Sequence, residues 1–367
     1  MKAKQLLTFT GMGLLMAISP MAMAQTVTAP RFPSPAAEVS QTIGLSKVTI
    51  NYSRPSVRGR EIWGNVVPFG MNNLGFGTAK ESPWRAGANE NTTITFSDQV
   101  GIGGTKINPG TYGLHLEMKE GGGATLILSS NSASWGSFFY DPEEDVVKTD
   151  VQTEEIAHVE TLQYVFSNPT QTSVVAAVEW EKLRVPFTIE FDTHNLVLES
   201  IKNELRNTAG FGWQGPASAA QYCLANNIEL DQAIIWAEQS INAQSNVNNL
   251  MLKSNILAKQ GKDAESVAAV KVALAHNTAS INNFYAYGRQ LIGAHKADDA
   301  MEIFMDASKK WPDHWLAPHG LARAYSAKGD FKKALKYEEE AYAEAPAGSK
   351  GFLEGYLKSL KEGKDFN

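Results

Sequence analysis

Cysteine is nearly absent from this chain of 367 residues, and so are the motifs of the common enzyme classes. Cys223 is the only cysteine, which excludes an intrachain disulfide. Its place in a helical core pattern indicates a buried, inert thiol rather than a nucleophile. The sequence has no HExxH or CxxC metal motif, no GxSxG nucleophile elbow and no GxxxxGK[ST] phosphate loop. We therefore expect no cofactor and no bound metal.

Excess positive charge and long apolar runs are also missing from most of the chain. The formal net charge is −6 and no basic run occurs, which argues against nucleic acid and anionic membranes as partners. The first residues are the exception, because Lys2 and Lys4 precede an apolar stretch, Leu6–Ile18, that ends in Ala22-Met23-Ala24. This pattern predicts a secretory signal peptide cleaved after Ala24, and hence a periplasmic or secreted protein with no membrane span.

Residues 36–192 alternate apolar and polar side chains with a period of two, which is typical of half-buried strands. The clearest runs are Val174–Trp180 and Leu183–Phe191, and Pro186 in the second run suits an edge position or a bulge. Glycine turns near residues 103, 110 and 122 predict that consecutive strands pair antiparallel. An antiparallel β-sandwich satisfies this pattern, and a flattened barrel is the alternative.

Beyond residue 192 the period is helical, and the chain repeats itself every 34 residues from starts at 247, 281 and 315. This register aligns Gly261, His295 and Gly329, and it resembles the tetratricopeptide repeat, an α-helical solenoid of helix hairpins. The predicted segments are a signal peptide at 1–24, a flexible N-terminus at 25–35, the β-sandwich domain at 36–192, a linking helix at 193–212, about four repeats at 213–348 and a capping helix at 349–367.

Several unusual strings in the β region carry a second resemblance. They are Tyr52-Ser53-Arg54-Pro55, Gly59-Arg60-Glu61-Ile62-Trp63-Gly64, Trp84-Arg85-Ala86-Gly87-Ala88-Asn89-Glu90, Pro109-Gly110-Thr111-Tyr112-Gly113-Leu114-His115, Ser134-Trp135-Gly136-Ser137-Phe138-Phe139-Tyr140-Asp141-Pro142 and Trp180-Glu181-Lys182. Together they resemble the bacterial family known as domain of unknown function 2911, over about residues 36–191. The resemblance implies an exported, mostly β domain, often from Bacteroidetes, with no catalytic assignment. The glycine- and asparagine-rich insert Met71–Pro83 departs from the family pattern.

The strongest candidate site in the β domain combines Arg85, Asn89 and Glu90 with His115 and Glu117. On the predicted strand, His115 and Glu117 share the face opposite to four apolar residues, and that face is either solvent or a cleft. If the loop of Arg85 crosses it, these groups could bind a polar ligand or support acid–base chemistry. The alternative is a structural Arg85–Glu90 pair with His115 on the surface.

The aromatic run Trp135, Phe138, Phe139 and Tyr140 is expected to close a core, with Trp135 the best candidate for an exposed ring that stacks on a sugar or a partner.

In the repeats, the second, fifth and ninth positions of each first helix should line the concave face. The candidates for a peptide groove there are Asn255, Tyr285, Arg289, His319 and Arg323. Arg289 and Arg323 occupy the same position one repeat apart, which predicts a ladder of guanidinium groups for an extended peptide or its carboxylate. A solvated face without a ligand is the alternative.

These features favour an exported, non-catalytic scaffold. Its β domain would recognise a small polar or carbohydrate ligand of the cell envelope, and its repeats would hold a protein or peptide. The alternative is a periplasmic hydrolase or lyase acting through His115 and Glu90. An enzyme requires His115 inside a concave pocket within hydrogen-bond reach of a carboxylate.

Overall fold

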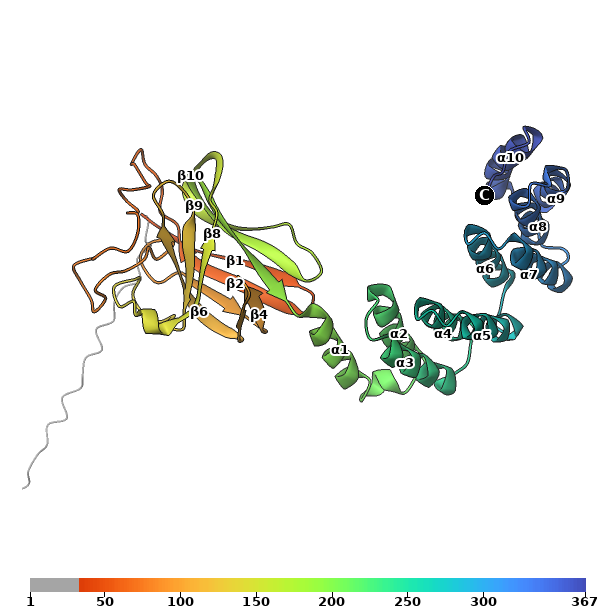
Figure 1. Cartoon of the computed structure of the whole chain (residues 1–367), viewed down its shortest axis with the longest axis horizontal. Helices are drawn as coiled ribbons and strands as arrows, with labels where there is room; N and C mark the ends of the chain where they lie inside the picture. The colour runs from red at the N-terminus through yellow and green to blue at the C-terminus, as the bar shows by residue number, and fades with distance from the viewer. Residues whose placement is uncertain (1–32) are drawn as a thin grey trace, which may run out of the picture. The chain divides into compact units, whose positions relative to one another are not determined.

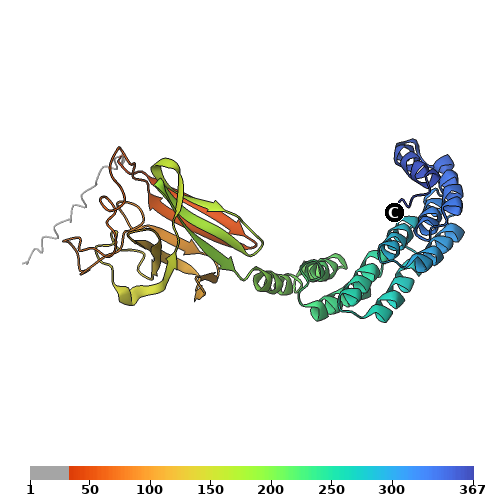
Figure 2. The ribbon, with the colours of Figure 1, turned by 45° about the horizontal axis from the view of Figure 1, so that its top comes forward.

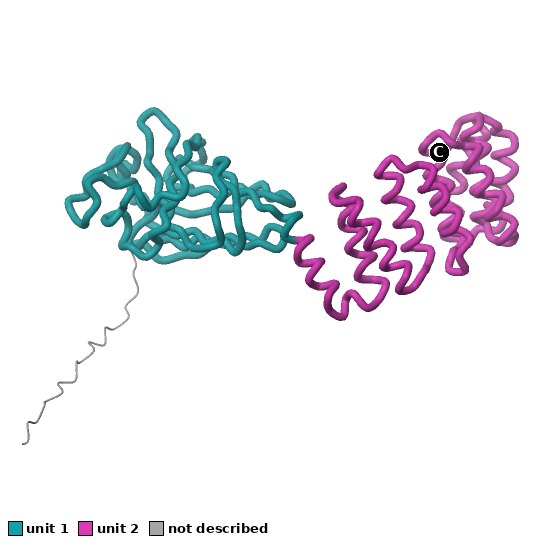
Figure 3. Tube along the Cα trace, turned by 60° about the horizontal axis from the view of Figure 1, so that its bottom comes forward, with its two compact units in different colours: residues 1–196 teal, residues 197–367 magenta. Residues whose placement is uncertain are grey.

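The computed structural model describes residues 33–367 and divides the chain into two compact units, residues 1–196 and 197–367 (Figure 3). The predicted signal peptide lies outside the described residues, as does the predicted flexible N-terminus up to residue 32. Among residues 33–367, no helix is both long enough and apolar enough to cross a membrane. The predicted fold class, antiparallel β structure followed by an array of helical repeats, is confirmed.

Unit 1 contains two antiparallel sheets (Figures 1 and 2). The six-stranded sheet has the order β1 (Ala36–Ile43), β2 (Ser46–Ser53), β3 (Thr93–Phe96), β6 (Gly110–Met118), β7 (Ala124–Ser129) and β8 (Asp145–Val151). The four-stranded sheet has the order β5 (Thr105–Ile107), β4 (Val100–Ile102), β10 (Ser173–Phe191) and β9 (Glu154–Ser167). Both sheets contribute side chains to one hydrophobic core.

That core follows from the period of two in the sequence. In β2, Val48 and Ile50 are buried whereas Lys47 and Asn51 are exposed. The largest fully buried side chain is Trp180 of β10. Each large apolar side chain removed from water in this way stabilises the fold by about 1.5–3 kcal/mol.

The two strands predicted at residues 174–180 and 183–191 are one strand, β10, with an irregularity at Glu181. Glu181 has φ 54°, and the pairing register with β9 shifts on both sides of it. One extra residue moves the buried side chains from mainly even positions, up to Trp180, to odd positions from Val185 onward. Pro186 lies neither at an edge nor in a bulge but between the β9 and β4 pairings, where its missing N–H costs no ladder bond.

The glycine turns join strands in two different ways. Gly103-Gly104 connects the antiparallel pair β4 and β5, and the turn at residues 121–123 connects β6 and β7. The turn at Pro109-Gly110 instead carries the chain from β5 to β6, which belong to different sheets. The prediction that consecutive strands pair is therefore wrong at this turn, because β5 is the edge of the smaller sheet and its apolar face closes the shared core.

Unit 2 is a curved array of helix hairpins (Figure 2). Helix α1 (Thr193–Glu204) starts in the last residues of unit 1 and continues into unit 2. The helices wholly within unit 2 are α2 (Gln214–Asn226), α3 (Leu230–Ala243), α4 (Val247–Lys259), α5 (Asp263–Ala275), α6 (Ile281–Gly293), α7 (Ala297–Lys310), α8 (Leu316–Ala327), α9 (Phe331–Glu344) and α10 (Ala347–Lys361). Helices α4, α6 and α8 begin at or within one residue of the predicted repeat starts. Cys223 is buried in the core around α2 and α3, and burial raises the pKa of its thiol to about 11.

The aligned residues Gly261, His295 and Gly329 all have a left-handed backbone, with φ 76°, 59° and 75°. Each follows the first helix of its repeat and ends it, the role for which glycine is best suited because it has no Cβ. His295 adopts the same conformation with a side chain attached, at a steric cost that glycine avoids.

The capping helix predicted for residues 349–367 is wrong in its last residues. Helix α10 ends at Lys361, Gly363 has φ 70°, and the segment 364–367 is not helical. A left-handed glycine directly after a helix turns the chain away from the helix axis. Figure 2 shows the chain end on the inner side of the curved array.

Candidate functional site

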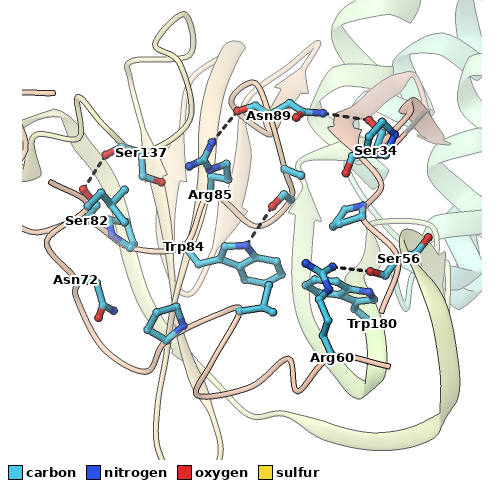
Figure 4. A pocket seen from close by; sticks show the side chains of 18 of the residues that line it. Ser34, Ser56, Arg60, Asn72, Ser82, Trp84, Arg85, Asn89, Ser137 and Trp180 are labelled. Atoms are coloured by element: carbon cyan, nitrogen blue, oxygen red, sulfur yellow. Dashed lines mark hydrogen bonds between the residues drawn. The ribbon is translucent and has the colours of Figure 1, made fainter. Parts of the chain in front are cut away.

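A cavity of about 500 Å³ opens in unit 1 between β10 and the long connection from β2 to β3 (Figure 4). This volume is in the range of small-molecule sites. Its walls come from residues 33–34 ahead of β1, from residues 55–60 and 66–89 of the connection, from Ser137 and from Trp180. We call it the arginine–tryptophan pocket.

Two indoles, those of Trp84 and Trp180, line the apolar side of this pocket, and a third, that of Trp63, packs against them. Trp84 and Trp180 are stacked, with ring centroids 6.1 Å apart and an interplanar angle of 20°, and Trp63 meets both rings edge-on. The backbone of Trp84 is fixed to β6, because it exchanges two hydrogen bonds of 2.9 Å with Leu116. The indole Nε1 of Trp84 donates to the carbonyl of Gly87 at 3.2 Å, which sets the ring orientation.

Arg58, Arg60 and Arg85 supply the polar side of the pocket. In the view of Figure 4, Arg85 and Arg60 lie on either side of the Trp84 indole. Within residues 33–367, none of the three arginines forms a salt bridge, and no aspartate or glutamate lines the pocket. The lining itself therefore carries positive charge without a carboxylate among its described residues, and the carboxylate on which the Arg58 charge acts, Glu160, lies outside the lining.

Backbone carbonyls position two of the guanidinium groups. Arg60 donates from Nη2 to Ser56 at 2.6 Å and from Nε to Val57 at 3.1 Å. Arg85 donates from Nη1 to the carbonyl of Asn89 at 2.8 Å, and burial lowers its pKa. Each guanidinium has five N–H donors, so these bonds leave donors for a ligand.

The insert Met71–Pro83 forms part of the wall, since Asn72, Leu74, Ser82 and Pro83 line the pocket. Its two ends pair through backbone hydrogen bonds of 3.0 and 2.8 Å between Asn72 and Ser82. Ser82 also donates from Oγ to the carbonyl of Ser137 at 2.8 Å. The insert thus forms part of the surroundings of Trp84.

The structure separates the five residues of the predicted β-domain site. Arg85 and Asn89 line the pocket, whereas Glu90, His115 and Glu117 do not. Glu90 accepts a hydrogen bond from Ser53 Oγ at 3.4 Å, and the Arg85 guanidinium bonds the carbonyl of Asn89, so the predicted Arg85–Glu90 pair is replaced by an Arg85–Asn89 contact.

His115 lies neither on the surface nor in a cleft. It is 2% exposed, its Nδ1 is 3.3 Å from Ser137 Oγ, and its ring meets Tyr140 edge-on. Burial and the charge of Arg85 lower its pKa to about 4. The prediction that this face of β6 is open is wrong, because the loop that contains Ser137 and Tyr140 folds over it. Within the described residues His115 has no hydrogen bond to a carboxylate, so the condition set for the enzyme alternative is not met.

Glu117, also on β6, is half-buried close to Tyr140. Burial, the 2.7 Å hydrogen bond from Tyr140 to Asp145 and the charge of Glu117 raise the pKa of Tyr140. Tyr140 is a core residue of the aromatic run, but Phe139 is 38% exposed and Trp135 is 51% exposed. The expectation that the run closes a core is therefore wrong for Phe139, which packs instead against Phe76 of the insert.

The candidate groove residues in the repeats differ in how exposed they are. Asn255 on α4 and Arg289 on α6 are exposed, and Tyr285 is half-buried. His319 and Arg323 on α8 are buried, with 1% and 6% of their surface exposed. The predicted ladder of free guanidinium groups is wrong at Arg323, because α10 and the residues that follow it cover this side chain.

Sequence reasoning did not single out Arg58, Arg60 or Trp180 as pocket residues. The signal was present in part, since Arg60 and Trp180 belong to the strings that carry the family resemblance. Among the described residues, no group of three or more histidine, cysteine, aspartate or glutamate side chains could hold a metal ion.

Comparison with known proteins supports this division of the chain. Residues 34–189 match the family model described as a protein of unknown function, DUF2911. The chain thus has a DUF2911 N-terminal half followed by tetratricopeptide-like repeats. No curated protein matches the chain.

Solved structures match only part of the chain. YrrB, described as a TPR protein with an unusual peptide-binding site, is 15% identical, with a TM-score of 0.30 over 46% of this chain and 87% of YrrB. MamA from Desulfovibrio magneticus RS-1 is 16% identical, with a TM-score of 0.29 over 41% of this chain and 90% of MamA. Human IFIT1, as a dimer with m7Gppp-AAAA, is 15% identical, with a TM-score of 0.30 over 46% of this chain and 42% of IFIT1.

Proposed function

From a DUF2911 domain followed by tetratricopeptide-like repeats, we propose that the protein is an exported, non-catalytic binding protein. The arginine–tryptophan pocket binds a small anionic ligand of the cell envelope, and the repeats hold a protein or peptide. The observation that carries the proposal is the set of three arginines around stacked indoles, with no carboxylate among the described lining residues.

The chemistry of the pocket favours a ligand that has both a negative group and a ring. A guanidinium group binds both oxygens of a carboxylate or phosphate in a fork, and it does so more strongly where water is excluded. Indole and proline faces offer flat apolar area against which a sugar ring packs. Trp84, Pro55 and Pro83 provide such faces, and Asn72 and Ser56 provide polar atoms for hydroxyl groups. An acidic sugar combines these requirements.

The repeats suit a different kind of partner. Arrays of helix hairpins present an extended concave face, which binds chains rather than small molecules. Tyr285 on α6 is close to the exposed Arg289 and to the covered Arg323, whose guanidinium carbons are 6.0 and 5.9 Å from its ring centroid. Aromatic rings and arginines are the side chains most enriched at the centres of protein interfaces.

Calorimetry with glucuronate as the probe tests the pocket, with glucose as the neutral control. We expect glucuronate to bind and glucose to bind at least about tenfold more weakly, because a charge-assisted fork contributes about 1.5–3 kcal/mol. Arg60→Gln and Arg85→Gln should each weaken glucuronate binding. Arg206→Gln, an exposed arginine in unit 2, should not. Equal binding of glucose and glucuronate, or no effect of the pocket variants, would refute the anionic-ligand assignment.

Export is tested separately by intact-mass measurement on protein from the periplasmic and secreted fractions. We expect a mature chain that begins at Gln25, since cleavage follows an Ala-x-Ala sequence. A chain recovered only with residues 1–24 in place contradicts export.

A further inference from the structure

The concave groove of the last two repeats is already occupied by a segment of this chain. After α10 ends, residues Asp365, Phe366 and Asn367 lie against side chains of α8 and α10. All of these elements belong to unit 2. The segment therefore shows how the groove holds an extended piece of chain.

An aromatic subsite receives Phe366. Its ring centroid is 4.8 Å from that of Tyr356 and 6.1 Å from that of His319, and the Arg323 guanidinium carbon is 5.2 Å from it. The imidazole of His319 is fixed from behind by Glu338, whose Oε2 is 2.7 Å from Nδ1. Glu338 thus fixes the His319 wall of this subsite through a contact that does not involve residues 365–367.

Polar contacts bind the side chains of the two residues on either side of Phe366. Ser326 Oγ donates to the Asp365 carboxylate at 2.6 Å, and the backbone N–H of Phe366 lies 3.3 Å from the same Oγ. The Asn367 carboxamide is recognised at both ends, because its Oδ1 accepts from Arg323 Nη1 at 3.2 Å and its Nδ2 donates to the Arg323 carbonyl at 3.0 Å. The groove thus has distinct positions for an acidic, an aromatic and an amide side chain.

The groove extends beyond what the segment fills. A cavity of about 430 Å³ adjoins Asp365 and Asn367, and Arg289, His295 and Arg323 are among the residues that wall it. The segment itself is weakly held, since residues 361–365 and Asn367 are exposed and only Phe366 is half-buried. Segments with so little buried surface open at low free-energy cost.

We propose that this groove is a recognition site for a partner segment of the form acidic–aromatic–asparagine, and that residues 365–367 are an intramolecular ligand which the partner displaces. This rests on the proposed role of the repeats and names the chemistry of their partner. A segment tethered to its own site has an effective concentration in the millimolar range, so it competes strongly with a free peptide.

The probe is a fluorescein-labelled peptide with the sequence of residues 358–367, measured by fluorescence anisotropy against the full chain. The chain with Phe366→Ala should bind it about tenfold or more tightly than the wild type, because its own segment no longer competes. The same peptide with alanine in place of its phenylalanine should not bind the Phe366→Ala chain. Adding Arg323→Lys to that chain should weaken binding of the unaltered peptide, since one ammonium group cannot both hold the Tyr285 hydroxyl, as Arg323 Nε does at 2.7 Å, and donate to the carboxamide oxygen, as Nη1 does.

Equal binding of the probe by the wild-type and Phe366→Ala chains, or equal binding of the two peptides, overturns the proposal. Self-association of the wild type through an exchanged segment also overturns it, in favour of a second copy as the occupant; analytical ultracentrifugation detects this. Affinity capture distinguishes a failure of this proposal from a failure of the proposed scaffold function. A chain that still captures envelope proteins through its repeats, yet does not bind the probe, keeps the scaffold function and loses this groove assignment.

Discussion

His115 should make the β domain lose stability as the pH falls. The ring is 2% exposed, lies against Ser137 and Tyr140, and has a pKa of about 4 instead of the ordinary 6.5. Burial is the main cause, because the protonated ring loses its hydration, and the charge of Arg85 acts in the same direction.

The direction of the change in the free energy of unfolding follows because the pKa of His115 is lower in the folded chain than in the unfolded chain. Above pH 6.5 the ring is neutral in both states and contributes no pH dependence. Between pH 6.5 and 4 the unfolded chain binds a proton that the folded chain does not, so the free energy of unfolding falls as the pH falls. The slope is about 1.4 kcal/mol per pH unit, or about 3 kcal/mol in total by pH 4.

Urea unfolding at several pH values between 7 and 4, compared for the wild type and His115→Gln, isolates this effect from other titrating groups. The variant should be less stable at pH 7, since it disturbs a packed site, but the difference should shrink or reverse toward pH 4. Histidine NMR should show one ring resonance that titrates near pH 4 and is absent in the variant. His295, an exposed histidine of unit 2, is the control when replaced by glutamine, and it should leave the slope for the β domain unchanged because it lies outside unit 1. Parallel curves for the wild type and His115→Gln would falsify the assignment of a buried, neutral imidazole.

Three further changes test unit 2 by urea unfolding followed with far-ultraviolet circular dichroism. His295→Gly should stabilise it by about 0.5–1 kcal/mol, because glycine adopts φ 59° without the Cβ penalty; a destabilised variant would show that the imidazole makes contacts worth more than the strain. Glu338→Ala should cost about 1–3 kcal/mol, because it leaves His319 Nδ1 buried without its 2.7 Å hydrogen-bond partner; an unchanged free energy of unfolding contradicts this. Gly320→Ala should cost about 1–3 kcal/mol, since the new Cβ would lie 2.3 Å from the buried Phe304 ring; an unchanged midpoint shows that the ring moves aside.

Much of the fold could be predicted because it depends on local periodicity. A period of two predicts β2 and β9, and a period of 34 residues predicts the starts of α4 and α6. Side-chain burial repeats with the geometry of the backbone, so the order of residues is enough to reveal it. The prediction failed at Glu181, where the apolar pattern changes phase but does not reveal that the runs on either side form one strand, because this depends on their shared pairing with β9.

The candidate sites depended on contacts between distant parts of the chain. The sequence by itself determined that Arg85 and Asn89 share a loop and that Arg289 and Arg323 share a repeat position. Only the tertiary structure decided that His115 is covered by the loop after β7 and that Arg323 is covered by residues 365–367. The reason is physical. Periodicity fixes which face of an element a side chain occupies, but what covers that face depends on how distant segments pack, and this is set by the sum of many weak contacts rather than by any local pattern.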